Sequence, residues 1–290
     1  MSTHASQDVP FPNTLSGQTA MRISRRRFLV TAGLAGLGAG LPVGHLEAGG
    51  QEEQSIPILN GAVARKELNL KFLFQGDSIT DGKWGRDQRD LNHYLGHGYV
   101  FAIASRLGAD FPNAGFQFTN RGMSGHRLSD LEKRWKKDTL DHRPDVLSIL
   151  VGVNDLNALQ RKKPDAYTAK EFDAHYRQLL DETFKSNPAL LLVLAPPFMY
   201  KVGARIEQWA FWEKELAPRA EIVRRLAKDY NAVFVDYPAL FARAIKIAPV
   251  EYWLWDGCHP SVFGHELMAR EWIRSVSSRL SFLKKYTCVA

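Results

Sequence analysis

Five short apolar runs alternate along this chain with longer segments in which apolar residues recur at helical spacing. The runs occupy residues 71–74, 116–119, 145–151, 190–195 and 232–235, and the helical segments occupy 98–109, 127–139, 169–186, 214–230 and 262–278. Short runs that stay apolar throughout are typical of strands buried on both faces, in parallel sheets whose crossover helices cover both sides. The pattern predicts an α/β fold: a doubly wound, flavodoxin-like three-layer sandwich with a five-stranded parallel sheet.

Small and polar residues follow four of these runs. The segments are GDSITDG at 76–82, NRGMSGHRLSDL at 120–131, GVNDL at 152–156 and, after the fifth run, DGCHPS at 256–261. Taken singly, each has an ordinary structural interpretation: a turn, a loop, a helix N-cap at Asn154 and a second turn. In doubly wound sheets, however, ligands bind outside the carboxyl ends of the strands, so all four segments are expected at one functional edge.

Three side chains in these segments match the needs of a serine nucleophile. A serine hydroxyl needs a base to remove its proton, and the base needs an acidic partner that fixes its tautomer and stabilises its cation. Ser78 would be the nucleophile, His259 the general base and then the acid, and Asp256 the orienting carboxylate. Asp256 precedes His259 by three positions, so one loop could carry both.

Together, the four segments resemble the sequence blocks of the SGNH, or GDSL, hydrolase family, over about residues 70–273. No block is missing from the chain. The resemblance implies a serine ester hydrolase in which Ser78 is the nucleophile and in which Asp256 and His259 complete the catalytic triad.

The same resemblance implies an oxyanion hole with three donors. They are the backbone N–H of Ser78, Gly125 and the side chain of Asn154. Gly122 is the less favoured alternative for the glycine. Asp77 and Asp155, which neighbour the serine and the asparagine, are expected to brace their loops by accepting hydrogen bonds from backbone N–H groups.

Other function classes lack their motifs here. Typical α/β-hydrolases carry the serine in a Gly-x-Ser-x-Gly elbow, which does not surround Ser78. No Gly-x-Gly-x-x-Gly follows the first run, and GVNDL is not a phosphate loop, so nucleotide binding is not supported. With only Cys258 and Cys288, the chain is not a disulfide scaffold. Neither cysteine makes a metal-ligand cluster, so no metal or other cofactor is expected.

Aromatic and basic residues near the functional edge are candidates for substrate contact. Segment 83–99 is long for a connection between a strand and a helix, and it contains Trp84 and Arg86. Long loops at such an edge often bind substrate, although a packed flap without ligand contact fits the composition equally well. Trp255, just before Asp256, could line an acyl or sugar pocket or could pack in the core.

Composition is typical of a soluble globular protein, with 45% hydrophobic and 24% charged residues. No apolar run approaches the roughly 20 residues that span a bilayer, so stable membrane insertion of the mature protein is not expected. The net charge is +7, of which the first 48 residues supply +2 from four arginines and two acidic residues, so +5 remains. The remaining basic residues are interspersed with acidic ones, and nucleic acid is not an expected partner.

The N-terminal segment resembles an export signal of the twin-arginine type. Residues 24–29, SRRRFL, precede the Gly- and Ala-rich run VTAGLAGLGAGLPVG. Residues 1–48 are expected to direct export to the periplasm or the outside, with cleavage near Ala48; an ordinary secretory signal or a short amphipathic tail is the alternative, and Met21 is an alternative start. The remaining chain is predicted to comprise a linker at 49–66, the hydrolase domain at 67–282 and a C-terminal tail at 283–290.

The predicted function is that of an exported serine esterase that hydrolyses carboxylic esters through an acyl-enzyme on Ser78. Export, the absence of an evident apolar lid and the polar, aromatic segment 83–99 favour deacetylation of a carbohydrate, so the expected partner is a small-molecule or saccharide ester. A lysophospholipase or other lipid acyl hydrolase is the alternative among enzymes. A non-catalytic saccharide-binding module is the alternative from another class, although binding alone does not require a nucleophile with its base.

Overall fold

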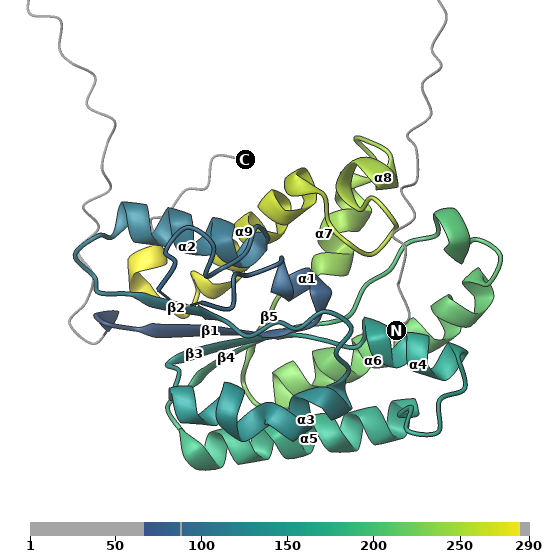
Figure 1. The fold of residues 1–290 in the computed structure, drawn as a ribbon, viewed down its shortest axis with the longest axis horizontal. Coiled ribbons are helices and arrows are strands. Elements are labelled where there is room, and N and C mark those ends of the chain that lie inside the picture. Colours follow the sequence, from purple (N-terminus) through teal and green to yellow (C-terminus); the bar gives the residue numbers. More distant parts are fainter. Residues whose placement is uncertain (1–66, 88, 285–290) are drawn as a thin grey trace, which may run out of the picture. The chain divides into compact units, whose positions relative to one another are not determined.

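A parallel sheet of five strands forms the centre of the domain (Figure 1). The computed structural model describes residues 67–87 and 89–284. The strands are β1 Lys71–Gly76, β2 Gln117–Asn120, β3 Val146–Leu150, β4 Leu191–Ala195 and β5 Val233–Phe234. Their order is β2-β1-β3-β4-β5, and every neighbouring pair is parallel. The predicted flavodoxin-like sheet is therefore confirmed.

Helices cover both faces of this sheet, as predicted for a three-layer sandwich. They are α1 Ser78–Asp81, α2 Tyr99–Asp110, α3 Leu128–Asp138, α4 Val153–Gln160, α5 Ala169–Ser186, α6 Trp209–Asp229, α7 Tyr237–Ala244, α8 Val250–Trp253 and α9 Val262–Val276. In Figure 1, α2, α7 and α9 lie on one face, and α3, α5 and α6 lie on the other. Each face has its own apolar core, with Phe74 and Trp272 buried in the first and Trp135 and Leu180 in the second.

Predicted and observed helices agree best where the sequence carries a local start signal. Helix α5 has the predicted bounds, and Thr168 and Glu171 form a capping box at its start. Helix α6 begins at Trp209 rather than at residue 214. The periodicity does not predict α1, α4, α7 and α8, because segments of four to eight residues are too short to show a helical period.

The carboxyl ends of β1 and β3 lie side by side at the point where the strand order reverses. Gly76 pairs in register with Leu150, and the chain runs from β1 to Ser78 and from β3 to Asn154. On the other side of β1, strand β2 ends at Asn120. Ligands bind at this switch point in doubly wound sheets, so three of the four predicted segments begin there.

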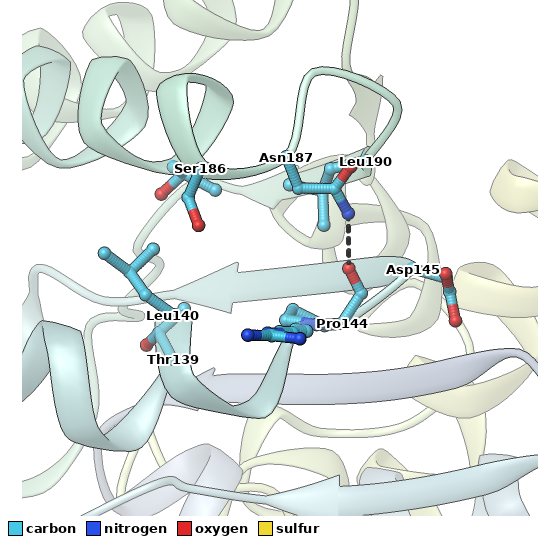
Figure 2. A pocket seen from close by; sticks show the side chains of 9 residues that line it. Thr139, Leu140, Pro144, Asp145, Ser186, Asn187 and Leu190 are labelled. Carbon is cyan, nitrogen blue, oxygen red and sulfur yellow. Dashed lines mark hydrogen bonds between the residues drawn. The ribbon is translucent and has the colours of Figure 1, made fainter.

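A pocket of about 270 Å³ lies at the opposite edge of the sheet, where β3 and β4 begin (Figure 2). Asp145 and Leu190, which immediately precede these strands, line the pocket. Asn187 also lines it, and donates a hydrogen bond from Nδ2 to the carbonyl oxygen of Pro144 at 3.1 Å. This pocket is therefore at the amino edge, away from the segments predicted to carry function.

Several sequence expectations concern residues outside the described range. They are the export signal at 1–48 and the linker at 49–66, which stay predictions. Cys288 also lies outside the described residues. Leu283 is buried in the turn η4 Ser281–Leu283, so the described fold runs past the predicted domain end at residue 282. Cys258 is a free, buried thiol.

The described residues include neither a candidate membrane-spanning helix nor a candidate metal-binding cluster. None of the helices in residues 67–87 and 89–284 combines the length and the apolar character that crossing a bilayer would need. In the same part of the chain, no group of three or more His, Cys, Asp or Glu side chains is arranged to hold a metal ion.

Candidate active site

Ser78 is the first residue of helix α1 and follows β1 after a single intervening residue, Asp77. Asp77 occupies the N-cap and accepts a hydrogen bond at Oδ1 from the backbone N–H of Ile79 at 3.0 Å. Gly82 ends the helix in the left-handed conformation, with φ 49°, which glycine adopts without steric strain. This one helical turn fixes Ser78 at the carboxyl edge, and the predicted bracing role of Asp77 is confirmed.

Ser78, His259 and Asp256 form a continuous chain of hydrogen bonds. Ser78 Oγ lies 2.7 Å from His259 Nε2, and His259 Nδ1 lies 2.8 Å from Asp256 Oδ2. The other carboxylate oxygen, Oδ1, accepts hydrogen bonds from the backbone N–H groups of Cys258 at 2.9 Å and His259 at 2.7 Å. The structure thus brings together the three side chains that the sequence assigns to a nucleophile, its base and the orienting acid.

Within this hydrogen-bonded triad, the pKa values of His259 and Asp256 shift in opposite directions. The hydrogen bond to Asp256 raises the pKa of His259 above its usual value, while burial acts against this rise. Burial alone would raise the pKa of Asp256, but hydrogen bonds from the His259 side chain and from backbone N–H groups hold that pKa well below its usual range. The Asp256 carboxylate is therefore ionised at neutral pH and can stabilise an imidazolium.

The loop that carries Gly125 is fastened to helix α1. Asp81 Oδ2 accepts hydrogen bonds from the backbone N–H of Ser124 at 2.9 Å and from its hydroxyl at 2.7 Å. Asn120 Oδ1 accepts a hydrogen bond from the Gly122 N–H at 2.9 Å. A Cβ at Gly122 would lie 2.3 Å from the Asp81 backbone nitrogen, so only glycine allows the loop to approach the helix this closely. The Gly122 N–H is therefore used within the loop. Gly125 follows Ser124, the residue bound by Asp81, and is not part of these contacts.

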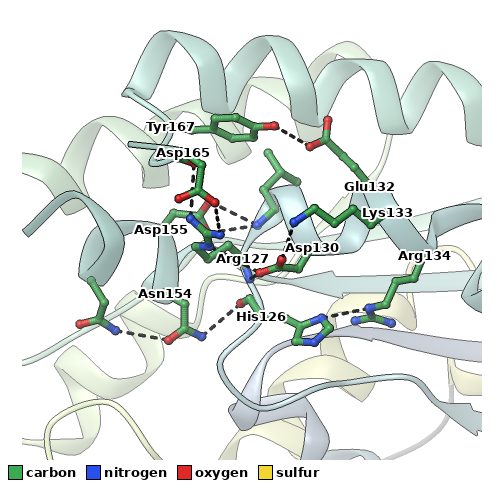
Figure 3. Close-up of polar contacts among 12 residues, drawn as sticks. His126, Arg127, Asp130, Glu132, Lys133, Arg134, Asn154, Asp155, Asp165 and Tyr167 are labelled. Carbon is green, nitrogen blue, oxygen red and sulfur yellow. Dashed lines mark hydrogen bonds and ion pairs between the residues drawn. The ribbon is translucent and has the colours of Figure 1, made fainter. Parts of the chain in front are cut away.

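Asn154 is the second residue of helix α4 and does not cap it. The N-cap is Gly152, so the alternative interpretation of Asn154 as an N-cap is wrong. Asn154 Nδ2 donates to the carbonyl oxygen of His126 at 3.1 Å, and Asn154 Oδ1 accepts from Asn157 Nδ2 at 3.3 Å (Figure 3). These contacts fix the orientation of the amide and use one of its two Nδ2 hydrogens.

Three hydrogen-bond donors remain unengaged at this edge. Across the residues that the structure describes, neither the backbone N–H of Ser78 nor that of Gly125 donates to another group. The second Nδ2 hydrogen of Asn154 is unused in the same sense. Gly125 has φ 82°, a conformation that a side chain would strain. Such a set of fixed donors is what stabilisation of an oxyanion requires.

Asp155 braces the loop of residues 121–127, which contains Gly122 and Gly125 and is called the glycine loop below, from the side of α4. Its two carboxylate oxygens lie 3.2 and 3.3 Å from the backbone nitrogen of Leu128, the first residue of α3. The predicted bracing role of Asp155 is therefore confirmed. Burial raises the pKa of Asp155 to about 7, against the opposing effects of the Leu128 N–H and of Arg219.

The three candidates for substrate contact differ in exposure. Trp84 is 7% exposed and donates from Nε1 to a backbone carbonyl of the glycine loop at 2.8 Å, so little of its ring could reach a substrate. The Arg86 guanidinium lies 4.1 Å from the Trp84 ring centroid and 2.9 Å from Asp81, and its side chain is half exposed. Trp255 is 64% exposed and stacks on His259, with ring centroids 5.9 Å apart. Trp255 is thus the aromatic candidate that borders the serine-histidine pair.

Four polar residues that contact this site have no role predicted from the sequence: Asp81, Asn120, Asn157 and Arg205. Asp81 lies in segment 76–82 and Asn120 in segment 120–131, so their positions beside the predicted site residues are a usable signal. Arg205 carries no such signal, because it lies in the turn η3 Gly203–Arg205 between β4 and α6 and meets Asp256 only through the fold.

Two sequence comparisons match this chain. Residues 74–267 match the family model described as "GDSL-like Lipase/Acylhydrolase family". An acetylxylan esterase of Geobacillus stearothermophilus is 33% identical over 211 residues, which cover 71% of this chain and 93% of that protein.

Solved structures match over a similar share of the chain. A candidate GDSL-like lipase from Parabacteroides merdae has a TM-score of 0.69 and 34% identity, over 73% of this chain and 97% of the other. A variant of an acetyl xylan esterase from Geobacillus stearothermophilus has a TM-score of 0.65 and 32% identity, over 72% and 94% of the two chains. Solved variants of that esterase described as catalytic mutants change an aspartate, a histidine three positions after it, and a serine.

Proposed function

Because the chain belongs to the GDSL-like lipase/acylhydrolase family and is a carboxylic ester hydrolase, we propose that it is an exported serine esterase that deacetylates a carbohydrate. The observation that carries the proposal is the 2.7 Å between Ser78 Oγ and His259 Nε2, a distance at which a base can take a hydroxyl proton. Ser78 is the proposed nucleophile, His259 the general base and Asp256 the group that orients it.

In the first half of the proposed reaction, His259 Nε2 takes the Ser78 proton as Ser78 Oγ bonds to the ester carbonyl carbon. The carbonyl oxygen becomes an oxyanion, which accepts hydrogen bonds from the N–H groups of Ser78 and Gly125 and from Asn154 Nδ2. As the bond to the alcohol oxygen breaks, His259 donates its proton to that oxygen. The alcohol leaves, and the acyl group stays on Ser78.

Water completes the second half. His259 takes a proton from the water molecule as the water oxygen bonds to the acyl carbon, and the same donors stabilise the new oxyanion. Ser78 Oγ then leaves and recovers a proton from His259, which releases the carboxylic acid. Asp256 stays ionised throughout and stabilises the imidazolium in both halves.

A carbohydrate acetyl ester is the proposed substrate. The support is the 33% identity to an acetylxylan esterase over 93% of that protein's length. A second support is the exposed indole of Trp255 beside His259, because an aromatic ring with an apolar body and a polar edge suits the mixed surface of a sugar.

Purified protein should hydrolyse a chromogenic acetate ester, and Ser78→Ala should abolish this activity. The variant should keep the wild-type melting temperature, because a hydroxyl at the edge of the sheet contributes little to burial. Steady-state rates and thermal melts on the same two samples make the test. Hydrolysis by Ser78→Ala at the wild-type rate would reject Ser78 as the nucleophile.

Acyl length and the alcohol part of the ester separate the alternatives. The proposal expects acetate esters to be hydrolysed faster than long-chain esters, and expects release of acetate from acetylated xylan. A preference for long chains would favour a lipid acyl hydrolase. Saccharide binding without hydrolysis of any ester would favour a binding module.

A further inference from the structure

Arg205 contacts Asp256 at two points. Its Nη1 donates to the backbone carbonyl oxygen of Asp256, and its Nη2 lies 3.6 Å from Asp256 Oδ2. That carboxylate oxygen is also the one that lies 2.8 Å from His259 Nδ1. The Arg205 side chain is only 19% exposed, so water screens this ion pair in part.

The segment that presents Arg205 is fixed against the loop that carries Asp256. Arg205 is the last residue of η3, within the connection from β4 to α6. In the same connection, the Tyr200 N–H donates to the carbonyl oxygen of Gly257 at 2.7 Å. A Cβ at Gly257 would lie 2.5 Å from the Tyr200 carbonyl oxygen, so glycine permits the close approach of the two backbones. The segment that carries Arg205 is therefore fixed by backbone contacts to the loop that carries Asp256, and the Arg205 guanidinium contacts Asp256 from this fixed position.

We propose that Arg205 is a positioning residue, which fixes the Asp256 carboxylate and keeps His259 free to accept a proton at neutral pH. The inference rests on the proposed roles of Ser78, His259 and Asp256. Asp256 must attract the imidazolium strongly enough to orient the ring. If the attraction were too strong, His259 would already be protonated at neutral pH and could not accept the Ser78 proton. A positive charge on the same carboxylate limits this attraction.

The charged and titratable groups that face His259 act in opposing directions. The hydrogen bond to Asp256 raises the pKa of His259 most, Asp77 at the end of β1 raises it further, and burial and Arg205 lower it. His265 on α9 is neutral near pH 7, because burial lowers its pKa to about 4. Arg205 thus supplies a fixed positive charge against two neighbouring carboxyl groups.

Two variants separate the charge of Arg205 from its geometry. Arg205→Gln removes the charge and keeps a donor for the Asp256 carbonyl, whereas Arg205→Lys keeps the charge and loses the planar two-point contact. In Arg205→Gln, the pKa of His259 should rise by about 0.5 to 1 unit, below the 1–3 units typical of a charge in direct contact, because a carboxylate lies between them. The acid limb of the kcat/KM profile should move to higher pH by the same amount.

In Arg205→Lys the acid limb should stay in place while the kcat/KM plateau falls about 10-fold, because the carboxylate loses its fixed orientation. Lys201→Gln is the matched control, since it removes a positive charge from an exposed position of the same connection, outside the Asp256 contacts. This control should leave both the limb and the plateau unchanged.

His259 can be titrated by NMR in a Ser78→Ala background, in parallel with rate profiles of the Ser78 enzymes. An unmoved titration and an unmoved acid limb in Arg205→Gln, with the rate lowered at every pH, would overturn the inference. If Arg205→Gln does not fold, wild-type rate and titration in Arg205→Lys would overturn it equally. A shifted titration in a protein without esterase activity would instead reject the proposed function and leave the charge effect of Arg205 standing.

Discussion

At the scale of single residues, the side chain of Asn154 is oriented by two neighbours. Its Nδ2 donates to the His126 carbonyl at 3.1 Å, and its Oδ1 accepts from Asn157 at 3.3 Å. Exchanging the amide oxygen and nitrogen would lose both contacts, so one orientation is strongly preferred. The remaining Nδ2 hydrogen is therefore held in place before any charge develops, which is the condition under which a donor stabilises an oxyanion best.

Asn154→Ala should lower kcat by about 10² to 10³, or roughly 2.7 to 4 kcal/mol, if Asn154 donates to the oxyanion. KM should change little, because that hydrogen bond is strongest in the transition state. The free energy of unfolding should fall by only about 1 kcal/mol, for the lost bond to His126. Steady-state kinetics and urea denaturation of one purified sample give all three values.

Asn187→Ala is a matched control for this variant. Asn187 Nδ2 also donates to a backbone carbonyl at 3.1 Å, that of Pro144, but at the amino edge of the sheet (Figure 2). The control should lose a similar free energy of unfolding and keep a normal kcat. A near-normal kcat in Asn154→Ala would remove Asn154 from the catalytic site.

At the scale of elements, two helices hold the glycine loop between them. Asp81 in α1 anchors Ser124, and Asp155 in α4 anchors Leu128 at the start of α3. Gly125 lies between the two anchored positions. The positions of α1 and α4 therefore determine where the Gly125 N–H lies, because the carboxylates of Asp81 and Asp155 bind the loop on either side of Gly125.

Asp155→Asn should change how stability depends on pH. Burial raises the folded pKa of Asp155 to about 7 from 3.8, so its stabilising contribution is present below the lower value and is lost as pH rises through the higher one. Asn keeps an acceptor for the Leu128 N–H but cannot ionise. The free energy of unfolding of the variant relative to wild type should therefore rise by roughly 2–4 kcal/mol between about pH 4 and pH 8.

Urea denaturation at several pH values measures this slope. Asp110→Asn, at the last residue of α2, makes the same change outside the glycine-loop contacts and is measured alongside as the control. A difference between Asp155→Asn and wild type that stays constant with pH would contradict the expectation.

The strands and the site segments were predictable because their signals are local. Each predicted run overlaps an observed strand, and their ends agree within two residues. The agreement is close because a strand buried on both faces appears in the sequence as a continuous apolar run. Ser78 and Asn154 follow strand ends, so topology places them at one edge. Helix α1 was not predicted, because four residues are too few to show a helical period and the helix depends on the Asp77 cap. The contact of Arg205 with Asp256 spans 51 positions and no motif marks it, so only the fold brings these residues together.

At the scale of the whole molecule, the described domain contains every group of the proposed reaction. The family match spans residues 74–267, and 72% of the chain covers 94% of a solved esterase. Cys258, next to the proposed base, is a free, buried thiol, and burial raises its pKa well above the usual range. It is therefore protonated and unreactive at neutral pH, so this part of the site does not need an oxidising compartment to form. Folding before export is compatible with this chemistry.

The proposed export by the twin-arginine route can be tested at the paired arginines of residues 24–29. Twin-arginine signals serve proteins that are exported already folded, and residues 24–29 pair Arg25 and Arg26 before Phe-Leu. Replacing both arginines with Lys in the full chain should leave active esterase inside the cell, because export fails while the domain still folds. Replacing Arg22 with Lys, outside the pair, is the matched control and should not affect export. Acetate-ester hydrolysis in separated cellular fractions measures the outcome, and unchanged export of the double variant would point to the ordinary secretory route instead.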